Sequence, residues 1–375
     1  MDTVYHKISL LENLEQTESN VSRLGYRPEL DGVRGISILL VFIHHLYYPI
    51  LPGGFLGVDI FFVLSGFLIT SILIEEWNQR NSISLKNFYI RRCLRLMPAV
   101  CFLVLTLNVF SFITNEKISS TIYQGSWLTL SYVSNWFYAL ELASPLNPLG
   151  VTWSLAVEEQ FYLIYPVIFY LILRFNIKRR TLLFVIALLI SLVALQRKFY
   201  WELGADIPRL YYGSDMRADA LLAGCLASLM FSWNIIPKSR KVSFYLQFIS
   251  GISVVFLTYL VTTTDSYSPI LYQRAGYTIV ALCVAVILVW LINHPSKIVL
   301  TILQFAPLVW VGRVSYGLYL WHWSFRYLLY QDQNLPPSLI HLLLAIVLSF
   351  SFTAFSYYFI EKRFLSWKSR FNAVN

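Results

Sequence analysis

The chain has 375 residues, of which 57% are hydrophobic and 13% are charged, and its mean hydropathy is +0.60. Because soluble domains carry about 25% charged residues, this composition excludes an ordinary soluble protein and indicates an integral membrane protein. The net charge of +9 does not indicate nucleic-acid binding, since the basic residues cluster between apolar segments, as topology signals and lipid-headgroup contacts do. The four cysteines lack CxxC spacing, so we expect neither disulfides nor a metal site.

The first 27 residues are polar and contain no apolar region of a signal peptide. We expect them to form a cytoplasmic tail, with an amphipathic surface helix over Val4–Leu14 as an alternative. A membrane-embedded domain is predicted over residues 28–364, and residues 365–375 are predicted to form a second cytoplasmic tail.

Ten apolar runs are long enough to span a bilayer. They fall at 35–52, 54–74, 98–114, 153–173, 181–196, 218–235, 242–262, 275–292, 312–330 and 338–360. An eleventh run, 121–140, is interpreted as outer-face or partly re-entrant structure, because leaving it out places most basic loops on one side, as the positive-inside rule requires. The exception is the basic segment 197–217 on the opposite side. The prediction is an all-α bundle of about ten transmembrane helices with both termini in the cytoplasm.

Two ionisable residues share one face of the first predicted span. Arg34 and His45 are eleven residues apart, which corresponds to a helix rotation of about 1100° and a rise of about 16 Å. Ionisable side chains at membrane depth usually belong to a site. Arginine suits phosphate recognition, and a neutral imidazole suits general-base catalysis. His44 points about 100° away from His45 and is the weaker candidate.

The second span begins with small residues that allow close helix packing, and it carries Asp59 near its outer end. We expect Asp59 either to pair with a buried cation or to act as an interfacial acid. The following segment, 84–97, is predicted to be an amphipathic helix on the cytoplasmic face, with Pro98 opening the next span. Arg92 and Arg95 lie on one side of that helix. They fit either a bidentate phosphate clamp or anchoring to lipid headgroups.

Two adjacent carboxylates, Glu158 and Glu159, enter the apolar span that begins near Trp153. Adjacent helical residues point about 100° apart, so at most one faces a given partner. One carboxylate can orient His45 as carboxylates orient catalytic imidazoles, and the alternative is a salt bridge that locks two helices.

Two later segments carry further polar residues. Asp215, Arg217 and Asp219 are interpreted as a self-contained ion-pair cluster, with carbohydrate contact as the second interpretation. Tyr316 and His322 lie in an aromatic segment whose tryptophans suit either sugar stacking or a membrane-interface belt. His322 is a second-line catalytic candidate, and Asp59, Trp153, Tyr316 and His322 are candidates for contacting the acceptor or supporting the residues that do.

Seven motifs in this order resemble the acyltransferase-3 family of bacterial membrane O-acyltransferases, from Arg27 to Phe364. They are Arg34-x10-His45, FFVLSGFLIT (61–70), Arg92-x-x-Arg95 before Pro98, WSLAVEEQFYLIYP (153–166), Arg217-x-Asp219-x-Leu-x-x-Gly224, SYGLYLWHW (315–323) and FIEK (359–362). The resemblance implies a multi-pass protein of the bacterial inner (cytoplasmic) membrane and functional roles for Arg34, His45, Arg92 and Arg95. It also implies transfer of an acyl group, usually acetyl from acetyl-CoA, to a carbohydrate hydroxyl.

The hypothesis is a channel in which Arg34, Arg92 and Arg95 bind the acyl-CoA donor while His45, with Glu158 or Glu159, activates the hydroxyl of a carbohydrate or glycolipid acceptor. Base catalysis and an acyl-histidine relay remain alternatives. Acyl-CoA is expected as co-substrate, with no tightly bound cofactor. We expect no fused extracytoplasmic hydrolase-like domain of the kind that some family members carry, so a relay through such a domain would need another protein.

Two other classes of function remain open. One is a proton-coupled transporter that uses His45, Glu158 and Glu159 as a relay, although the sequence shows no inverted repeat of the kind many transporters carry. The other is a non-catalytic scaffold for envelope-polysaccharide assembly, which predicts no donor binding.

Overall fold

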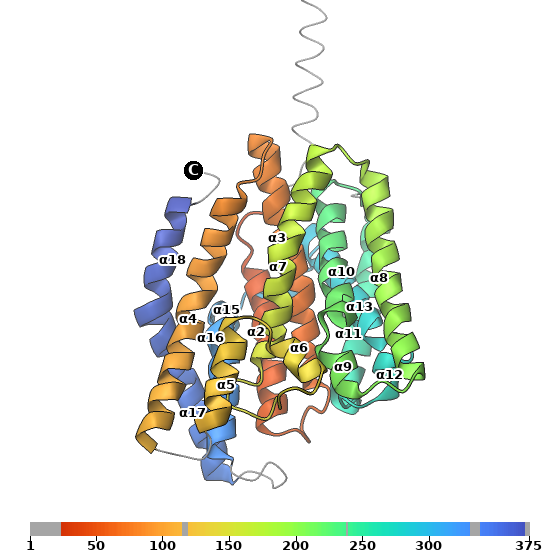
Figure 1. Ribbon diagram of the computed structural model, residues 1–375. Helices are drawn as coiled ribbons and strands as arrows, with labels where there is room; N and C mark the ends of the chain where they lie inside the picture. The colour runs from red at the N-terminus through yellow and green to blue at the C-terminus, as the bar shows by residue number, and fades with distance from the viewer. Residues whose placement is uncertain (1–23, 115–118, 238, 331–337, 372–375) are drawn as a thin grey trace, which may run out of the picture.

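The computed structural model describes residues 24–114, 119–237, 239–330 and 338–371, and these ranges contain helices, turns and no strand (Figure 1). The all-α expectation is therefore confirmed for the described part of the chain. Apolar runs of this length adopt helices because a helix satisfies its backbone hydrogen bonds internally where no water is available. The possible helix over Val4–Leu14 lies outside the described residues.

Seven described segments are long and apolar enough to cross a membrane. Their helices are α3 (Gly57–Arg80) with the preceding turn η1 (Gly54–Leu56), α4 (Leu85–Thr114), α7 (Thr152–Arg174), α8 (Arg179–Glu202), α11 (Arg240–Thr263), α13 (Gly276–Asn293), and α17 (Leu339–Phe355) continued by η2 (Ser356–Glu361) and α18 (Lys362–Lys368). Three more helices coincide with the remaining predicted spans, namely α2 (Pro28–Leu46), α10 (Ser214–Ser232) and α16 (Ser315–Leu329). These three carry most of the polar candidates, and their crossing of a membrane stays a prediction.

Shorter helices connect the long ones. They are α5 (Ser119–Leu130), α6 (Ser134–Ala139), α9 (Ile207–Tyr212), α12 (Pro269–Tyr272), α14 (Lys297–Leu303), α15 (Ala306–Arg313) and η3 (Ser369–Phe371). The region 121–140 is divided between α5 and α6 by a turn at Tyr132, which has a left-handed φ of 54°. It therefore forms no continuous span, in agreement with its exclusion from the span count.

The predicted break at Pro98 is wrong. Residues 85–114 form one helix, α4, with Pro98 inside it. A membrane helix tolerates an internal proline because neighbouring groups and local adjustment satisfy the freed backbone carbonyl. The consequence for the site is that Arg92 and Arg95 lie on the same rigid helix as the apolar segment that follows.

Helices α3 and α10 cross with their backbones in close contact. A Cβ added at Gly66 would lie 1.9 Å from the carbonyl oxygen of Leu221, and one added at Gly224 would lie 2.0 Å from that of Val63. Small residues at such crossings let membrane helices pack tightly. The expectation that the glycines of the second span allow close packing is confirmed at Gly66.

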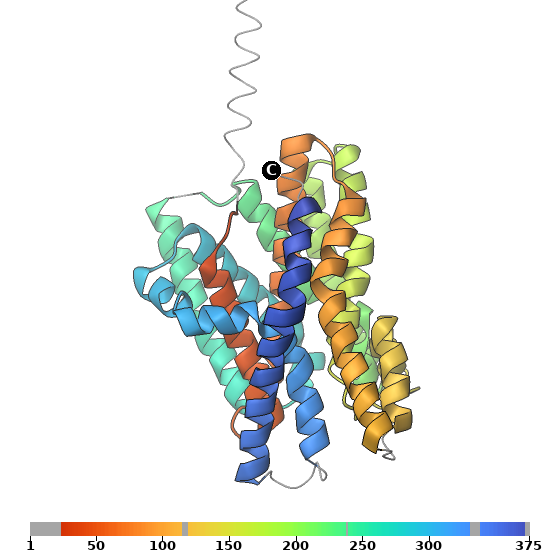
Figure 2. The same cartoon turned by 90° about the vertical axis from the view of Figure 1, so that its left-hand side faces the viewer.

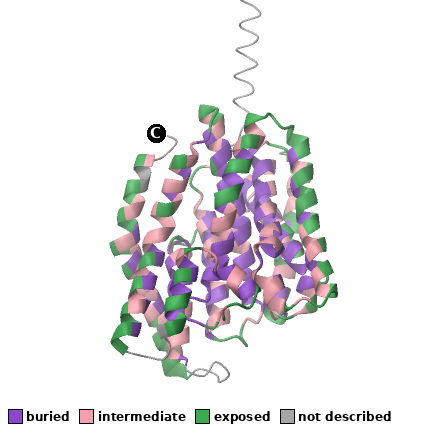
Figure 3. Ribbon diagram, viewed as in Figure 1, coloured by how far each residue is buried: buried purple, intermediate pink, exposed green. Residues whose placement is uncertain are grey.

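Buried residues occupy the centre of the bundle, and exposed ones lie on its outer helices (Figure 3). Many exposed side chains are large and apolar, for example Leu192 of α8, Phe248 of α11 and Val347 of α17. An apolar outer surface of this kind is expected where lipid replaces water as the solvent.

The start of α2, the α3–α4 turn and the end of α18 lie at the same end of the bundle (Figures 1 and 2). Residues 365–371, part of the predicted C-terminal tail, are helical, and Arg91 of α4 donates a hydrogen bond to the carbonyl oxygen of Phe371 over 2.6 Å. The first and last described segments are thus on one side, and residues 1–23 and 372–375 of the predicted tails lie outside the described residues.

Candidate active site

The first candidate cavity, which we call the arginine cavity, has a volume of about 220 Å³ and lies between α2, α3, α4, α7 and α16. Arg34 of α2 lines it together with Arg92 and Arg95 of α4. The structure therefore brings together the three arginines that the sequence analysis assigned to the donor. Arg92 lies over the ring of Tyr162, with its guanidinium carbon 3.8 Å from the ring centroid.

The charges that line the arginine cavity are not balanced. Its one acidic lining residue is Glu158, whose carboxylate accepts hydrogen bonds from Ser65 over 3.1 Å and from Tyr162 over 3.2 Å. No described carboxylate forms an ion pair with Arg92 or Arg95. A concave site with surplus guanidinium groups suits a phosphorylated ligand, because arginine recognises phosphate with paired N–H donors.

A histidine pair lies beyond this cavity. The Nδ1 atom of His45 lies 2.8 Å from Nε2 of His322, and Nδ1 of His322 lies 3.0 Å from the carbonyl oxygen of Leu318. Because a carbonyl only accepts, Nδ1 of His322 carries a proton, and its Nε2 accepts the proton on Nδ1 of His45. The lone pair of His45 is therefore on Nε2, the nitrogen that a general base or nucleophile uses.

His45 lines a second cavity of about 110 Å³, which we call the histidine cavity. Its walls are rich in aromatic side chains, which include Trp153, Tyr211, Tyr212, Tyr319 and Trp323. The ring centroids of His45 and Trp323 are 4.9 Å apart. Within the described residues, the hydroxyls of Tyr211 and Tyr212 have no hydrogen-bond partner, so they can donate to a ligand.

The two cavities share two lining residues, Val58 of α3 and Tyr319 of α16. Arginines lie on one side of these residues and His45 lies on the other. This arrangement agrees with the expected alignment of Arg34 and His45 along one face of α2. In place of the expected channel, the structure has two cavities whose walls share these two residues.

The sequence predicts that a carboxylate supports His45, but the structure places no carboxylate of the described residues against its ring. The ring partner of His45 is His322, whereas Glu158 points into the arginine cavity and Glu159 lines neither cavity. Rotation along α7 explains the difference between the two glutamates, since neighbouring side chains diverge by about 100°. One oxygen of Glu159 is buried without a hydrogen-bond partner in the described part of the chain.

Asp59 pairs with a buried cation, as one of the two expectations proposed. Its Oδ1 lies 2.7 Å from Nη2 of Arg217, and both side chains are 1% exposed. The ring of Tyr277 lies under the Arg217 guanidinium, 3.8 Å from centroid to carbon. Asp59 lines neither cavity, so its position indicates support of the fold rather than contact with an acceptor.

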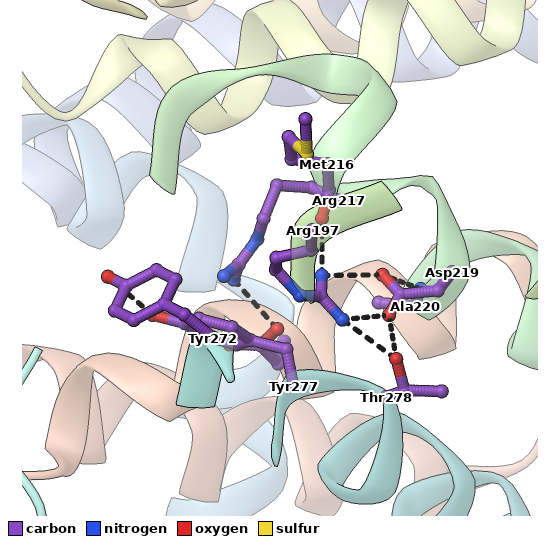
Figure 4. Close-up of polar contacts among 9 residues, drawn as sticks. Arg197, Met216, Arg217, Asp219, Ala220, Tyr272, Tyr277 and Thr278 are labelled. Carbon is purple, nitrogen blue, oxygen red and sulfur yellow. Dashed lines mark hydrogen bonds and ion pairs between the residues drawn. The ribbon is translucent and has the colours of Figure 1, made fainter. Parts of the chain in front are cut away.

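The expectation of a self-contained ion-pair cluster at 215–219 is wrong, because each charge pairs with another element. Asp219 binds Arg197 of α8 over 2.6 Å, and Arg197 also donates to Thr278 of α13 over 2.7 Å (Figure 4). Asp215 accepts two hydrogen bonds from Arg209 of α9, which raise the pKa of that guanidinium. All four cations in the 197–217 segment thus pair with a carboxylate, since Lys198 also lies 3.6 Å from Glu202, which explains why the segment departs from the charge asymmetry of the other loops.

Three further residues line the cavities: the candidate Tyr316, and Val58 and Tyr319, which the sequence did not indicate. Tyr316 lines the arginine cavity and donates to the carbonyl oxygen of Leu96 over 3.1 Å, so it lies on the side of the arginines rather than near His45. Val58 and Tyr319 were not predicted. For Tyr319 a signal exists, because it lies three residues before His322 and so faces the same side of α16.

The fold and the site define a helical membrane protein with a cationic cavity that adjoins an aromatic, histidine-containing one. The model of a family described as an acyltransferase domain matches residues 27–360, and the chain belongs to this family. The resemblance stated from the seven motifs is therefore confirmed.

Curated relatives are similar over most of this chain. It is 34% identical over 347 residues to the peptidoglycan O-acetyltransferase OatA of Listeria monocytogenes, covering 90% of this chain and 55% of that protein. It is 35% identical to the putative peptidoglycan O-acetyltransferase YrhL of Bacillus subtilis, with coverage of 90% and 54%. A putative O-acetyltransferase of Staphylococcus aureus is 34% identical, with coverage of 93% and 60%. The chain thus spans little more than half the length of these relatives, and no solved structure matches it.

Proposed function

We propose that this protein is a membrane O-acyltransferase that moves an acetyl group from acetyl-CoA to a hydroxyl of a cell-envelope carbohydrate. The observation that carries the proposal is the junction of the two cavities. Arg34, Arg92 and Arg95 line the cavity on one side of Val58 and Tyr319, and His45 lines the cavity on the other. A donor with phosphates at one end and a reactive thioester at the other matches this order.

Acetyl-CoA enters the arginine cavity from the end of the bundle where α3 meets α4, which we assign to the cytoplasm of a bacterial cell. Arg34, Arg92 and Arg95 bind its phosphates through charge-assisted hydrogen bonds. At about 220 Å³ the cavity is smaller than the usual range for whole ligands of about 300–1,000 Å³. It therefore receives the flexible arm of the coenzyme while the nucleotide stays at the mouth.

Nε2 of His45 then removes the proton of the acceptor hydroxyl. The alkoxide oxygen attacks the thioester carbonyl carbon, the carbon–sulfur bond breaks, and the coenzyme thiolate takes the proton back from His45. His322 holds the His45 ring in the required tautomer. General-base catalysis of this kind typically contributes a factor of about 10²–10⁴.

A covalent version uses the same atoms in two steps. Nε2 of His45 attacks the thioester carbon, the carbon–sulfur bond breaks and the thiolate leaves. The acceptor hydroxyl then attacks the acyl carbon of the acyl-imidazole, the carbon–nitrogen bond breaks to regenerate His45, and the hydroxyl proton passes to the coenzyme thiolate. Purified protein incubated with acetyl-CoA and no acceptor distinguishes the versions, since only the covalent one gives an acetyl mass increase on the His45 peptide.

The acceptor binds in the histidine cavity, where aromatic faces can stack on a sugar ring and the hydroxyls of Tyr211 and Tyr212 can donate hydrogen bonds. Among envelope carbohydrates we assign peptidoglycan first, because OatA and YrhL carry that substrate in their names. Acceptor access is from the membrane face opposite the cytoplasm.

The test uses purified full-length protein in lipid nanodiscs with [¹⁴C]acetyl-CoA and soluble peptidoglycan glycan fragments. The expected result is a radiolabelled, base-labile ester on the glycan and release of free coenzyme A thiol. A protein that binds no acetyl-CoA, or that binds it without thiol release in the presence of several envelope glycans, contradicts the proposal. The first of these outcomes would support the scaffold alternative.

The transporter alternative is less well supported by the described contacts. A proton relay needs hydrogen-bonded steps, and no described hydrogen bond joins His45 to Glu158 or Glu159. Glu158 bonds to Ser65 and Tyr162 instead. Proton uptake into proteoliposomes in the absence of acyl-CoA would restore that alternative.

A further inference from the structure

Two side chains separate the arginine cavity from the histidine cavity. Val58 and Tyr319 line both cavities, and they are 5% and 6% exposed. Under the proposed function, on which this inference rests, the thioester must pass between them to reach His45. The acyl chain leads that passage, because the coenzyme follows it from the arginine side.

Tyr319 is held in place by its own hydroxyl. The hydroxyl donates to the carbonyl oxygen of Val151 over 3.0 Å and lies 2.7 Å from Oγ of Ser154. Since its proton is used on the carbonyl, the oxygen of Tyr319 accepts from Ser154. Movement of the ring out of the passage would break both hydrogen bonds, and an unsatisfied buried polar group is costly.

Val58 is fixed by its backbone neighbours. A Cβ added at Gly57 would lie 2.4 Å from the carbonyl oxygen of Ser37, so the backbones of α3 and α2 are in close contact beside Val58. On the other side of Val58, Asp59 is tied to Arg217. The valine side chain itself has one strongly preferred rotamer in a helix.

We propose that Val58 and Tyr319 form an acyl gate that sets the length of the acyl chain this protein transfers. The fixed ring and the branched side chain let an acetyl group through and hinder each added methylene. A longer chain must also fit beside the acceptor hydroxyl in the histidine cavity of about 110 Å³. Discrimination by one methylene in an enzyme pocket typically amounts to about 10- to 200-fold.

The experiment measures thiol release from acetyl-CoA, propionyl-CoA and butyryl-CoA by the full-length protein in nanodiscs, with soluble peptidoglycan glycan fragments as acceptor. The readout is the ratio of kcat/KM for butyryl-CoA to that for acetyl-CoA. Val58→Ala is expected to raise this ratio about tenfold or more, and Val58→Ile to lower it. Ser154→Ala, which removes one of the two hydrogen bonds that hold the Tyr319 hydroxyl, is expected to raise it as well.

The control is Val63→Ala, which removes the same atoms from a fully buried valine of α3 that lines neither cavity. It is expected to leave the ratio within about twofold of the wild-type value, since it changes packing but not the passage. A ratio that stays at the wild-type value in Val58→Ala overturns the gate. If Val58→Ala does not fold, the same result in Ser154→Ala overturns it. That outcome differs from failure of the proposed function, in which the wild type releases no thiol from acetyl-CoA.

Discussion

Nδ1 of His45 and Nε2 of His322 lie 2.8 Å apart, although the two residues are 277 positions apart in the chain. The contact joins α2 to α16 and leaves the lone pair on Nε2 of His45, a residue that lines the histidine cavity. Because His322 in turn donates to the carbonyl oxygen of Leu318, the backbone of α16 determines which nitrogen of His45 is free. Catalytic imidazoles are commonly oriented by a carboxylate, and here a second imidazole takes that place.

Replacement of His45 by alanine is expected to abolish acetyl transfer in either version of the chemistry. General-base catalysis alone accounts for about 10²–10⁴-fold in rate, and loss of a covalent nucleophile removes the route altogether. The measurement is [¹⁴C]acetyl incorporation into glycan by purified protein, with acetyl-CoA binding as the folding control. Turnover near the wild-type rate in His45→Ala would exclude His45 from the chemistry.

The variant His322→Phe keeps the ring volume but removes the acceptor for the Nδ1 proton of His45. An unsatisfied buried donor costs about 1–3 kcal/mol, so we expect kcat to fall about 10- to 100-fold while acetyl-CoA affinity is retained. His341→Phe changes an exposed histidine of α17 and serves as the matched control. Equal activity of the two variants would mean that His322 does not orient His45.

The double variant Arg92→Ala, Arg95→Ala is expected to weaken acetyl-CoA binding at least about 100-fold, since each charge-assisted contact contributes about 1.5–3 kcal/mol. Titration calorimetry with acetyl-CoA, repeated at several salt concentrations, measures this effect. Arg80→Ala with Lys86→Ala removes two exposed cations from the same end of the bundle. If both double variants bind acetyl-CoA like the wild type, the arginine pair would be assigned to lipid headgroups instead.

The membrane helices and the arginine cluster could be predicted because their signals are local. Apolar runs of sufficient length define helices without knowledge of their neighbours, and the spacing of Arg34, Arg92 and Arg95 shows which way each side chain faces on its own helix. The positive-inside rule then predicts that all three lie on one side of the membrane. The structure places them in one cavity, as that argument expects.

The partners of the buried charges could not be predicted in the same way. Helical periodicity predicts which face of α7 carries Glu158. Its hydrogen-bond partner, Ser65, depends on how α7 packs against α3. The pair Asp59–Arg217 joins two helices 158 positions apart in the chain, and the pair Asp219–Arg197 joins α10 to α8. Charges that are close together along the chain suggest a local cluster. A buried charge instead pairs with the neighbouring helix that supplies an opposite charge at the same depth. Pro98 was misassigned because a membrane helix tolerates a proline that would end a soluble one.

Asp59→Asn is expected to destabilise the protein without removing a catalytic group. It leaves the Arg217 guanidinium buried without its opposite charge, and breaking one partner of a buried pair costs about 3–5 kcal/mol. The measurement is the thermal unfolding midpoint of the purified protein in detergent, with the exposed Glu141→Gln as control. The double variant Asp59→Leu, Arg217→Met is expected to recover most of the loss, because replacing both charges removes the desolvation cost. Equal midpoints for Asp59→Asn and Glu141→Gln would contradict a structural role for this pair.

Tyr211→Leu is expected to weaken acceptor binding while leaving donor binding intact. Tyr211 lines the histidine cavity but not the arginine cavity, so the loss of its ring removes a stacking surface from the acceptor side alone. Aromatic stacking contributes about 0.5–1.5 kcal/mol, which corresponds to a rise of about two- to tenfold in the acceptor KM.

The matched variant Tyr211→Phe keeps the ring, so it separates stacking from hydrogen bonding by the hydroxyl. Kinetics with soluble glycan fragments at saturating acetyl-CoA give the acceptor KM, and calorimetry gives the donor Kd. A change confined to the donor Kd would place the acceptor elsewhere than the histidine cavity.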